Sequence, residues 1–281
     1  MDEEINRLRL RATTSLIGRK DVIIICSVSC IYGIGSPEAY KSLLVHIDKL
    51  SPLDQKAFLH SLVNIHYVRN DLVLEPGTFR VRGDVIEIFP AYEESALRIE
   101  LFGDDVEKIY TFHPITGEVQ RDFEDYWVYP AKHFVTTREN LNRAMGDIRE
   151  ELSERLKYLR VEGMLLEAQR LEQRTLYDLE MMAELGYCSG IENYSRHLEG
   201  RKEGERPSTL IDFFPDDFLQ FTDESHVSVP QIRAMYNGDR SRKMNLVEHG
   251  FRLPSALDNR PMKFEEFEKA LNQVVYVSAT P

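Results

Sequence analysis

The sequence predicts a mixed α/β protein in which an α/β scaffold is interrupted by a β-rich segment and then by a helical one. A β-branched run at 21–28 shows no alternation of apolar and polar residues, as in strands buried on both faces of a parallel sheet. Residues 64–129 instead show alternating strand patterns with frequent turn signals. Residues 138–186 then place apolar residues at spacings of three and four, which is typical of amphipathic helices.

The first part of the chain predicts a helix over 5–17, the strand over 21–28, a loop and a second helix. The loop at 29–37 bears two glycines and ends in a Ser-Pro pair, which suits the N-cap and first position of a helix over 38–50. In open α/β sheets, loops at the carboxyl ends of strands are where ligands bind. A ligand-binding role for this loop is therefore expected.

The β-rich segment predicts a sheet with one apolar and one charged face. Arg80 and Arg82 alternate with apolar residues along one strand, and Arg98 and Glu100 do so along another. Such charges often do no more than form the solvent-exposed face of an antiparallel sheet. The alternative is a protein-binding face. Arginines on a strand are held in a fixed direction, and arginine is enriched among the residues that contribute most to binding at protein interfaces.

The helical segment ends in a polar loop that carries Tyr187, Tyr194, Arg196 and His197. Aromatic and basic residues together are typical of single-stranded DNA grooves, which use them for base stacking and phosphate contact. A Gly/Pro/charge-rich connector at 199–208 follows and predicts a domain boundary.

The last part of the chain returns to α/β character. A strand is predicted within 210–223, a helix over 231–250, a short helix over 264–271 and a final strand over 274–277. The chain therefore ends as it begins, with strands and helices in alternation.

Composition limits the possible partners and compartments. The formal net charge is −12, so any contact with nucleic acid is expected to be local rather than spread over a basic surface. The longest apolar run is 22–26, which is too short to cross a membrane, and the acidic start does not fit a signal peptide. Three cysteines form no C-x-x-C pair, so neither a disulfide framework nor a zinc site is indicated. We expect a cytoplasmic protein with no membrane partner.

Two motifs follow predicted strands near the end of the chain. Asp223 and Glu224 open a D-E-S-H sequence, and Ser278 opens an S-A-T sequence. An ATP-hydrolysing site uses one carboxylate for Mg²⁺ and a second to orient the attacking water. The alternative for so short a motif is an acidic turn that has no functional role. The chain contains no G-x-x-x-x-G-K-[ST] phosphate-binding sequence.

Several longer stretches carry a family resemblance. They are SVSCIYGIGSP (27–37), GTFRVRGD (77–84), EAQRL (167–171), GIENYSRH (190–197), FPDDF (214–218), DESH (223–226), MYNGDR (235–240) and FRLPSALDNRP (251–261). With D-E-S-H and S-A-T resembling the hydrolysis and coupling elements of helicase superfamily 2, the chain resembles the UvrB family almost end to end.

The resemblance implies a partial RecA-like P-loop NTPase domain of helicase superfamily 2 with two insertions. Residues 1–41 and 209–281 would form parts of the motor domain. Residues 42–135 would be an inserted β-rich domain that docks UvrA, and residues 136–208 a helical domain that borders the DNA path. The phosphate-binding loop, the aromatic β-hairpin and the second motor domain of the family have no counterpart in this sequence, so it resembles a fragment.

The resemblance also implies roles for individual residues. Asp223 would bind Mg²⁺ and Glu224 would activate water, while His226, Ser278 and Thr280 would couple hydrolysis to DNA. The implied UvrA-facing set is Arg69, Arg80, Arg82, Arg98 and Glu100, and the implied DNA or hairpin contacts are Arg174, Glu192, Tyr194 and Arg196. Because exposed strand arginines seldom carry stability, replacing Arg80 and Arg82 by Ala is expected to weaken UvrA binding and leave the fold intact.

The implied function is the damage-recognition and verification subunit of the bacterial nucleotide excision repair excinuclease UvrABC. Its partners would be UvrA, UvrC and damaged DNA, and ATP and Mg²⁺ would be cofactors of the full-length protein. The present chain alone is expected neither to bind ATP tightly nor to hydrolyse it. One alternative is a non-enzymatic UvrA-binding module such as that of the transcription-repair coupling factor, and another is an ordinary DExH helicase.

Overall fold

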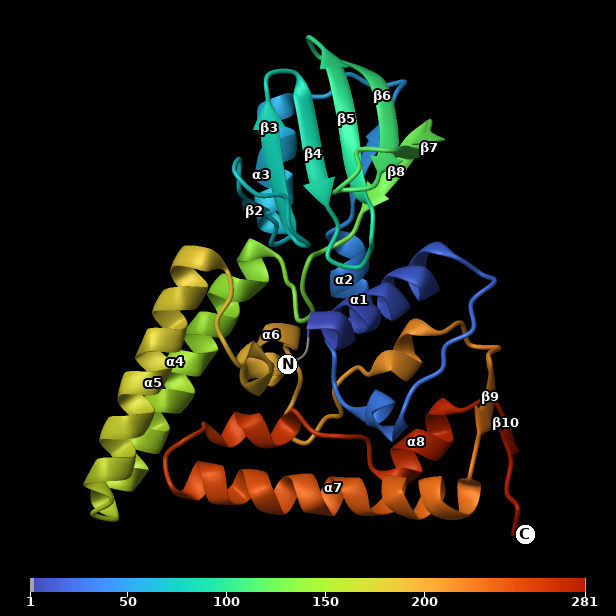
Figure 1. The fold of residues 1–281 in the computed structure, drawn as a ribbon. Helices are drawn as coiled ribbons and strands as arrows, with labels where there is room; N and C mark the ends of the chain where they lie inside the picture. Colours follow the sequence, from blue (N-terminus) through green and yellow to red (C-terminus); the bar gives the residue numbers. More distant parts are fainter. Residues whose placement is uncertain (1–2, 281) are drawn as a thin grey trace. The chain divides into compact units, whose positions relative to one another are not determined.

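The computed structural model of this protein describes residues 3–280 and divides into two compact units (Figure 1). The first unit runs up to Val22 and again from Glu38 to Val135. The second contains Ile23–Pro37 and the chain from Thr136 onward.

A six-stranded sheet forms the centre of the first unit. Its strand order is β2-β3-β4-β5-β6-β7, with all neighbours antiparallel except the parallel pair β2 and β3. The strands are β2 (Val68–Arg69), β3 (Thr78–Arg82), β4 (Val85–Phe89), β5 (Ala96–Phe102), β6 (Asp105–Phe112) and β7 (Val119–Phe123). Gly83 and Gly103 take positive φ angles in the tight turns after β3 and β5, where residues with a Cβ are strained. The β-rich character predicted for 64–129 is confirmed.

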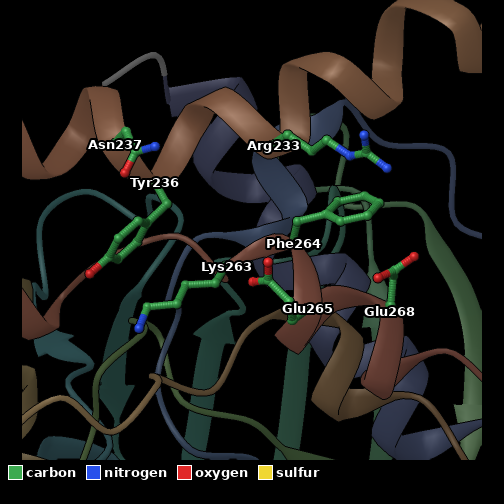
Figure 2. Close-up of a pocket in the computed structure, with 7 residues that line it drawn as sticks. All are labelled: Arg233, Tyr236, Asn237, Lys263, Phe264, Glu265 and Glu268. Atoms are coloured by element: carbon green, nitrogen blue, oxygen red, sulfur yellow. The ribbon is translucent and has the colours of Figure 1, made fainter.

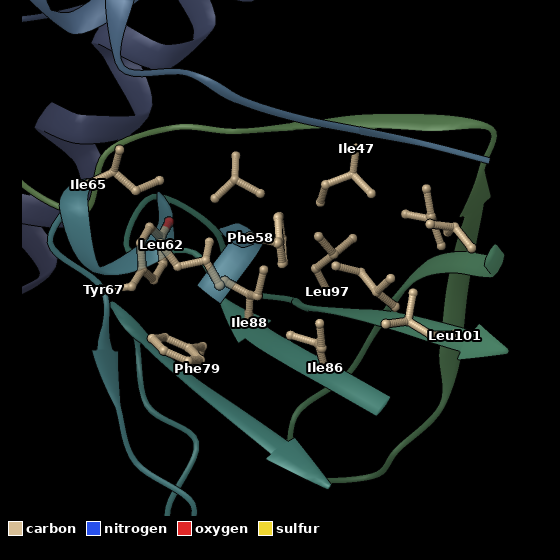
Figure 3. Packing of buried hydrophobic residues seen from close by; sticks show 14 of the residues in the cluster. Ile47, Phe58, Leu62, Ile65, Tyr67, Phe79, Ile86, Ile88, Leu97 and Leu101 are labelled. Carbon is tan, nitrogen blue, oxygen red and sulfur yellow. The ribbon is translucent and has the colours of Figure 1, made fainter. Parts of the chain in front are cut away.

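One face of this sheet builds the main core with helix α3 (Gln55–Asn64), as Figure 3 shows. Phe58 and Leu62 of the helix pack in one cluster with Ile86, Ile88 and Leu97 of the sheet. The inward positions alternate along each strand, so the apolar side chains leave water together. The residues that alternate with these apolar positions along each strand lie on the opposite face of the sheet.

The predicted helix over 38–50 is wrong beyond its first turns. Helix α2 (Pro37–Ser42) ends early, and the chain enters strand β1 (Val45–Asp48), which pairs antiparallel with β8 (Asp125–Val128). Ile47 is buried in the main core through this pairing. Helix α1 (Glu3–Gly18) confirms the helix predicted over 5–17.

The predicted strand over 21–28 is also wrong. Ile23 and Ile25 are 90% and 97% exposed, and none of the strands in residues 3–280 pairs with this stretch. A run of β-branched residues needs neighbours on both sides to become a buried strand. Here residues 22–27 form no regular secondary structure, and the chain then enters the 3₁₀ turn η1 (Val28–Ile31).

The helical part of the second unit is a pair of long helices, α4 (Arg138–Val161) and α5 (Leu165–Leu185), lying side by side (Figure 1). Their buried residues recur at helical spacing, which confirms the helical prediction for 138–186. Gly186 ends α5 in the left-handed conformation. The chain continues through η2 (Ile191–Tyr194) and α6 (Ser195–Glu199).

The rest of the second unit returns to α/β structure. Strands β9 (Leu219–Thr222) and β10 (Gln273–Tyr276) confirm the two strands predicted here, and they pair in a two-stranded parallel sheet. The elements between them are α7 (Ser225–Glu248), the 3₁₀ turn η4 (Pro254–Asp258) and α8 (Phe264–Ala270); a further 3₁₀ turn, η3 (Leu210–Phe213), precedes β9. Helix α7 begins six residues before the predicted helix over 231–250.

Candidate functional sites

The charged face of the six-stranded sheet carries a row of side chains that pair across four strands. Arg80 on β3 lies opposite Glu87 on β4, and Glu87 lies opposite Arg98 on β5. Arg98 lies opposite Tyr110 on β6, and Glu100 lies opposite Lys108. We call these six residues the charged ladder. Cross-strand neighbours of this kind have Cβ atoms close enough for their side chains to interact directly.

Glu87 is the centre of the ladder. Arg80 Nε donates a hydrogen bond to Glu87, and Arg98 donates from Nη2 (2.5 Å) and from Nε (2.8 Å) to the Oε1 atom of Glu87. Glu87 is only 4% exposed. Burial by itself would raise the pKa of Glu87, but the hydrogen bonds and charges of the two guanidinium groups outweigh it, and the pKa is lowered. The carboxylate therefore stays charged and doubly paired.

Tyr110 extends the ladder toward Glu100. The Nη1 atom of Arg98 donates to the Tyr110 hydroxyl (3.1 Å), which donates in turn to Glu100 Oε1 (2.6 Å). Lys108 Nζ donates to Glu100 Oε2 at 3.1 Å. The hydrogen bond from Tyr110 is the main cause that lowers the pKa of Glu100, with Lys108 adding to it against a smaller effect of burial. The guanidinium of Arg98 also lies 4.4 Å from the centre of the Phe112 ring.

Arg69 and Arg82 lie at the β2–β3 side of the same sheet. Arg69 pairs with Asp71 at 3.0 Å, and Asp71 also accepts the backbone N–H of Val81. Arg82 is exposed at the end of β3. The structure thus joins Arg80, Arg98 and Glu100 of the predicted partner-facing set in one network and leaves these two arginines open to solvent.

Sequence reasoning missed Glu87, Tyr110 and Lys108. Within β4, Val85, Glu87 and Phe89 share one face of the strand because successive side chains alternate. The sequence pattern was therefore sufficient to place Glu87 on the charged face. Its burial was not readable, because that depends on two arginines reaching it from neighbouring strands.

The two motifs near the end of the chain meet, as expected for parallel neighbouring strands. The Nδ1 atom of His226 lies 2.9 Å from Ser278 Oγ, and the Ser278 hydroxyl donates to the carbonyl of Thr280 (2.6 Å). Since that hydroxyl hydrogen is used, Nδ1 of His226 must carry the proton that Ser278 Oγ accepts. A backbone hydrogen bond from Ser225 to Val277 (2.9 Å) also ties the motifs together.

The two carboxylates of this motif lie in the turn between β9 and α7, and both are exposed. The backbone N–H of Glu224 donates to Asp223 Oδ1 at 2.9 Å, and Ser228 Oγ donates to the Asp223 carbonyl at 2.8 Å. Glu224 has φ of 43°, a left-handed conformation that is strained for a residue with a Cβ. The turn thus holds two exposed carboxylates next to the His226–Ser278 pair, and Glu224 Oε2 lies 3.5 Å from Nδ1 of His226.

These carboxylates fit part of a magnesium site. Asp223 could supply one oxygen ligand, which suits Mg²⁺ because that ion often keeps several waters and substrate phosphates as its other ligands. Among residues 3–280 there is no group of three or more His, Cys, Asp or Glu residues placed to hold a metal.

The loop after α5 is held by buried polar contacts. Tyr194 is 6% exposed and its hydroxyl donates to Asp178 Oδ2 (2.8 Å), which Arg174 also contacts from Nε (3.0 Å). A Tyr194 ring in this position offers no face to a base, so the predicted stacking contact does not fit it. Arg174 remains 42% exposed in its side chain, and Glu192 is half-buried in η2.

Arg196 is likewise engaged inside the second unit. It donates to Asp258 Oδ2 (2.9 Å) and lies 3.6 Å from Glu151, which also holds His197 at 2.6 Å. Only 16% of the Arg196 side chain is exposed. The predicted nucleic-acid contact therefore does not fit Arg196 in this arrangement, because two carboxylates already occupy its guanidinium.

A pocket of about 560 Å³ lies between α7 and α8 (Figure 2). It is lined by Arg233, Tyr236, Asn237, Lys263, Phe264, Glu265 and Glu268. Two of its cations lie over aromatic rings, Arg233 over Phe264 (4.3 Å) and Lys263 over Tyr236 (5.2 Å). None of the residues predicted as sites lines this pocket, and its balanced charges favour neither an anion nor a cation.

No helix in residues 3–280 is long and apolar enough to cross a membrane.

Comparison with known families matches the β-rich and the helical segments of the chain. A family described as the UvrB interaction domain matches residues 45–134, and a family described as the UvrB third helical domain matches residues 139–200. The charged ladder lies within the first range and α4 and α5 almost entirely within the second.

Several curated proteins are similar to the whole chain. UvrABC system protein B of Chlorobaculum tepidum is 60% identical over 100% of the chain, which covers 41% of that protein. The protein of the same name from Bacillus licheniformis is 58% identical over 100% of the chain (43% of that protein), and that from Streptomyces avermitilis is 57% identical over 100% (39% of that protein). The chain thus spans about two fifths of the length of these relatives.

Proposed function

This chain belongs to the UvrB family, and from that membership we propose that it provides the UvrA-docking face of the nucleotide excision repair subunit UvrB. The observation that carries the proposal is the charged ladder inside the segment that matches the UvrB interaction domain. Arg69, Arg80, Arg82, Arg98 and Glu100 would contact UvrA, as the resemblance implied.

The physical properties of this face suit a protein partner. Arginines fixed on strands lose little side-chain entropy when they bind, and their planar donors match carboxylates in two-point contacts. The ladder carries three cations and two carboxylates, whereas the whole chain has a formal charge of −12. An acidic surface on UvrA would therefore be attracted locally and aligned by arginines that are already in place.

The second unit would contribute to an ATP-driven motor in the full-length protein. We propose that Asp223 and Glu224 act on Mg²⁺·ATP within a RecA-like domain, Asp223 as a metal ligand and Glu224 by orienting the attacking water. Bound Mg²⁺ would neutralise charge on the phosphates. The His226–Ser278 hydrogen bond supports a role for both motifs in coupling hydrolysis to DNA, because it connects the two strand ends directly.

The wider role follows the family. We propose damaged DNA and UvrC as further partners of the full-length protein, a cytoplasmic location, and Arg174 and Glu192 as the residues near the DNA path or hairpin. Tyr194 and Arg196 would act there only by holding the loop, because both side chains are already bound within the unit.

The alternative of a non-enzymatic UvrA-binding module is less well supported. A module that only binds UvrA does not need the carboxylate pair of an ATP-hydrolysing site. In this chain, however, such a pair lies beside a strand: Asp223 and Glu224 lie together with His226 and Ser278. The docking proposal is common to both readings.

The docking proposal is tested by titrating purified UvrA against the immobilised chain and mapping the bound state by hydrogen exchange. We expect saturable binding, with slower amide exchange in β3 to β6 and unchanged exchange in α4 and α5. Protection confined to the helices, or no binding, would refute the docking proposal.

A further inference from the structure

We infer that Glu87 is a positioning residue that presents Arg80 and Arg98 to UvrA. The inference rests on the proposed docking function and adds to it a residue outside the implied partner-facing set. Glu87 itself is 4% exposed, so it offers little surface to a partner. Its effect on binding would therefore pass through the two arginines.

The geometry supports a positioning role for Glu87 and a contacting role for Arg80 and Arg98. The side chains of Arg80 and Arg98 are 19% and 30% exposed, so each keeps part of its surface accessible while its guanidinium is bound to Glu87. Both arginines are direct cross-strand neighbours of Glu87 in the register of the sheet. One carboxylate thus sets the position of two cations that come from different strands.

Charge counting points the same way. Arg80, Arg98 and Lys108 pair with only two carboxylates, Glu87 and Glu100, so the ladder has a net charge of +1. Glu100 at the far end is neutralised by Lys108 and held by Tyr110. A complementary acidic partner would meet fixed positive charge near Arg80 and Arg98.

Stabilisation of the fold explains the buried Glu87 carboxylate less well than positioning of the two arginines does. On this side of the sheet Phe89, Ala96, Tyr110 and Phe112 form a small apolar cluster. A buried ion pair is commonly no more stabilising than apolar side chains of similar volume. Prepositioning of arginines gives the carboxylate a role that an apolar side chain could not fill, because unfixed arginines would have to be ordered on binding.

The test is a double-mutant cycle on UvrA affinity in the full chain. Glu87→Gln keeps the volume and removes the charge, and we expect its Kd for UvrA to rise about tenfold. In a background carrying Arg80→Gln and Arg98→Gln, which keep hydrogen-bond donors near Glu87, the same change should raise Kd less than about twofold. The control is Glu107→Gln, an exposed carboxylate on β6 outside the ladder, which should leave Kd unchanged.

A second variant guards against loss of fold. Glu87→Asp keeps the charge and shortens the side chain, so it should stay folded by circular dichroism and still weaken UvrA binding through the same cycle. An equal rise in Kd in both backgrounds would mean a general structural effect and would overturn the inference. Unchanged binding by Glu87→Gln, with the arginine variants weakened, would overturn it as well. Failure of the wild-type chain to bind UvrA would instead refute the docking function on which it rests.

Discussion

Arg80 and Arg82 stand two residues apart on β3, on the same face of the sheet, and have different surroundings. Arg80 is partly buried and pairs with the buried Glu87, whereas Arg82 is exposed. The expectation that both could be replaced without an effect on the fold therefore needs correction for Arg80. Removing one partner of a buried pair leaves charge without compensation.

We predict that Arg80→Ala lowers the free energy of unfolding by about 1–3 kcal/mol, because Arg98 alone would then compensate Glu87. Arg82→Ala should change it by less than about 0.5 kcal/mol. Urea unfolding followed by circular dichroism measures both. Equal stability of the two variants would show that Arg80 and Glu87 do not form a buried pair.

His133 is buried in the first unit. Both of its ring nitrogens lack a hydrogen-bond partner in residues 3–280, and burial lowers its pKa from 6.5 to about 3, with the charge of Arg9 adding to the effect. The unfolded chain binds a proton near pH 6.5 and the folded chain does not. This group therefore makes the free energy of unfolding fall as the pH drops below about 6.5, by roughly 2 kcal/mol at pH 5.

Replacing His133 by Gln should remove that part of the pH dependence. Urea unfolding at pH 7.5 and pH 5 in the wild type and in His133→Gln gives the comparison. The difference between the two pH values should be smaller in the variant, whatever its stability at pH 7.5. An identical difference in both proteins would contradict the burial of a neutral His133.

Among the elements, the pairing of β9 with β10 brings the D-E-S-H and S-A-T motifs together. The hydrogen bonds at Ser278 require the Nδ1–H tautomer of His226. We predict that nitrogen-15 NMR finds this tautomer in the wild type and a mixture of tautomers in Ser278→Ala. Ser228→Ala is the matched control, because its hydroxyl bonds the nearby Asp223 carbonyl and does not touch the imidazole. The same tautomer mixture in wild type and both variants would contradict the contact.

The elements also show what local patterns can and cannot predict. Alternation gave the correct faces for Arg80, Arg98 and Glu100, because strand geometry is a local property. It failed at 38–50, where pairing of Val45 with Val128 overrides a helical pattern through a partner about eighty residues away. The stretch 21–28 failed for the same kind of reason, since a buried strand is defined by its neighbours. Contacts such as Glu87 with two arginines depend on three strands in register, which no local pattern contains.

On the scale of the whole molecule, the proposed docking face and the proposed motor residues lie in different compact units. We predict that this chain binds UvrA without hydrolysing ATP, because its sequence holds no phosphate-binding loop to place ATP against Asp223 and Glu224. A coupled assay with Mg²⁺, ATP and purified UvrA checks this, using UvrA alone as the control. Turnover above that of UvrA alone that is abolished by Glu224→Gln would refute it.

We propose that the charged ladder, together with Arg69 and Arg82, forms the UvrA-binding face. The most direct measurement compares the UvrA affinity of the wild-type chain with Arg82→Glu and with Arg121→Glu. Both are exposed arginines of the same sheet, but Arg121 lies on β7 opposite Thr111, outside the ladder. We predict at least about a tenfold loss of affinity for Arg82→Glu and no loss for Arg121→Glu. Equal affinity of all three proteins, or a loss confined to Arg121→Glu, would contradict the claim.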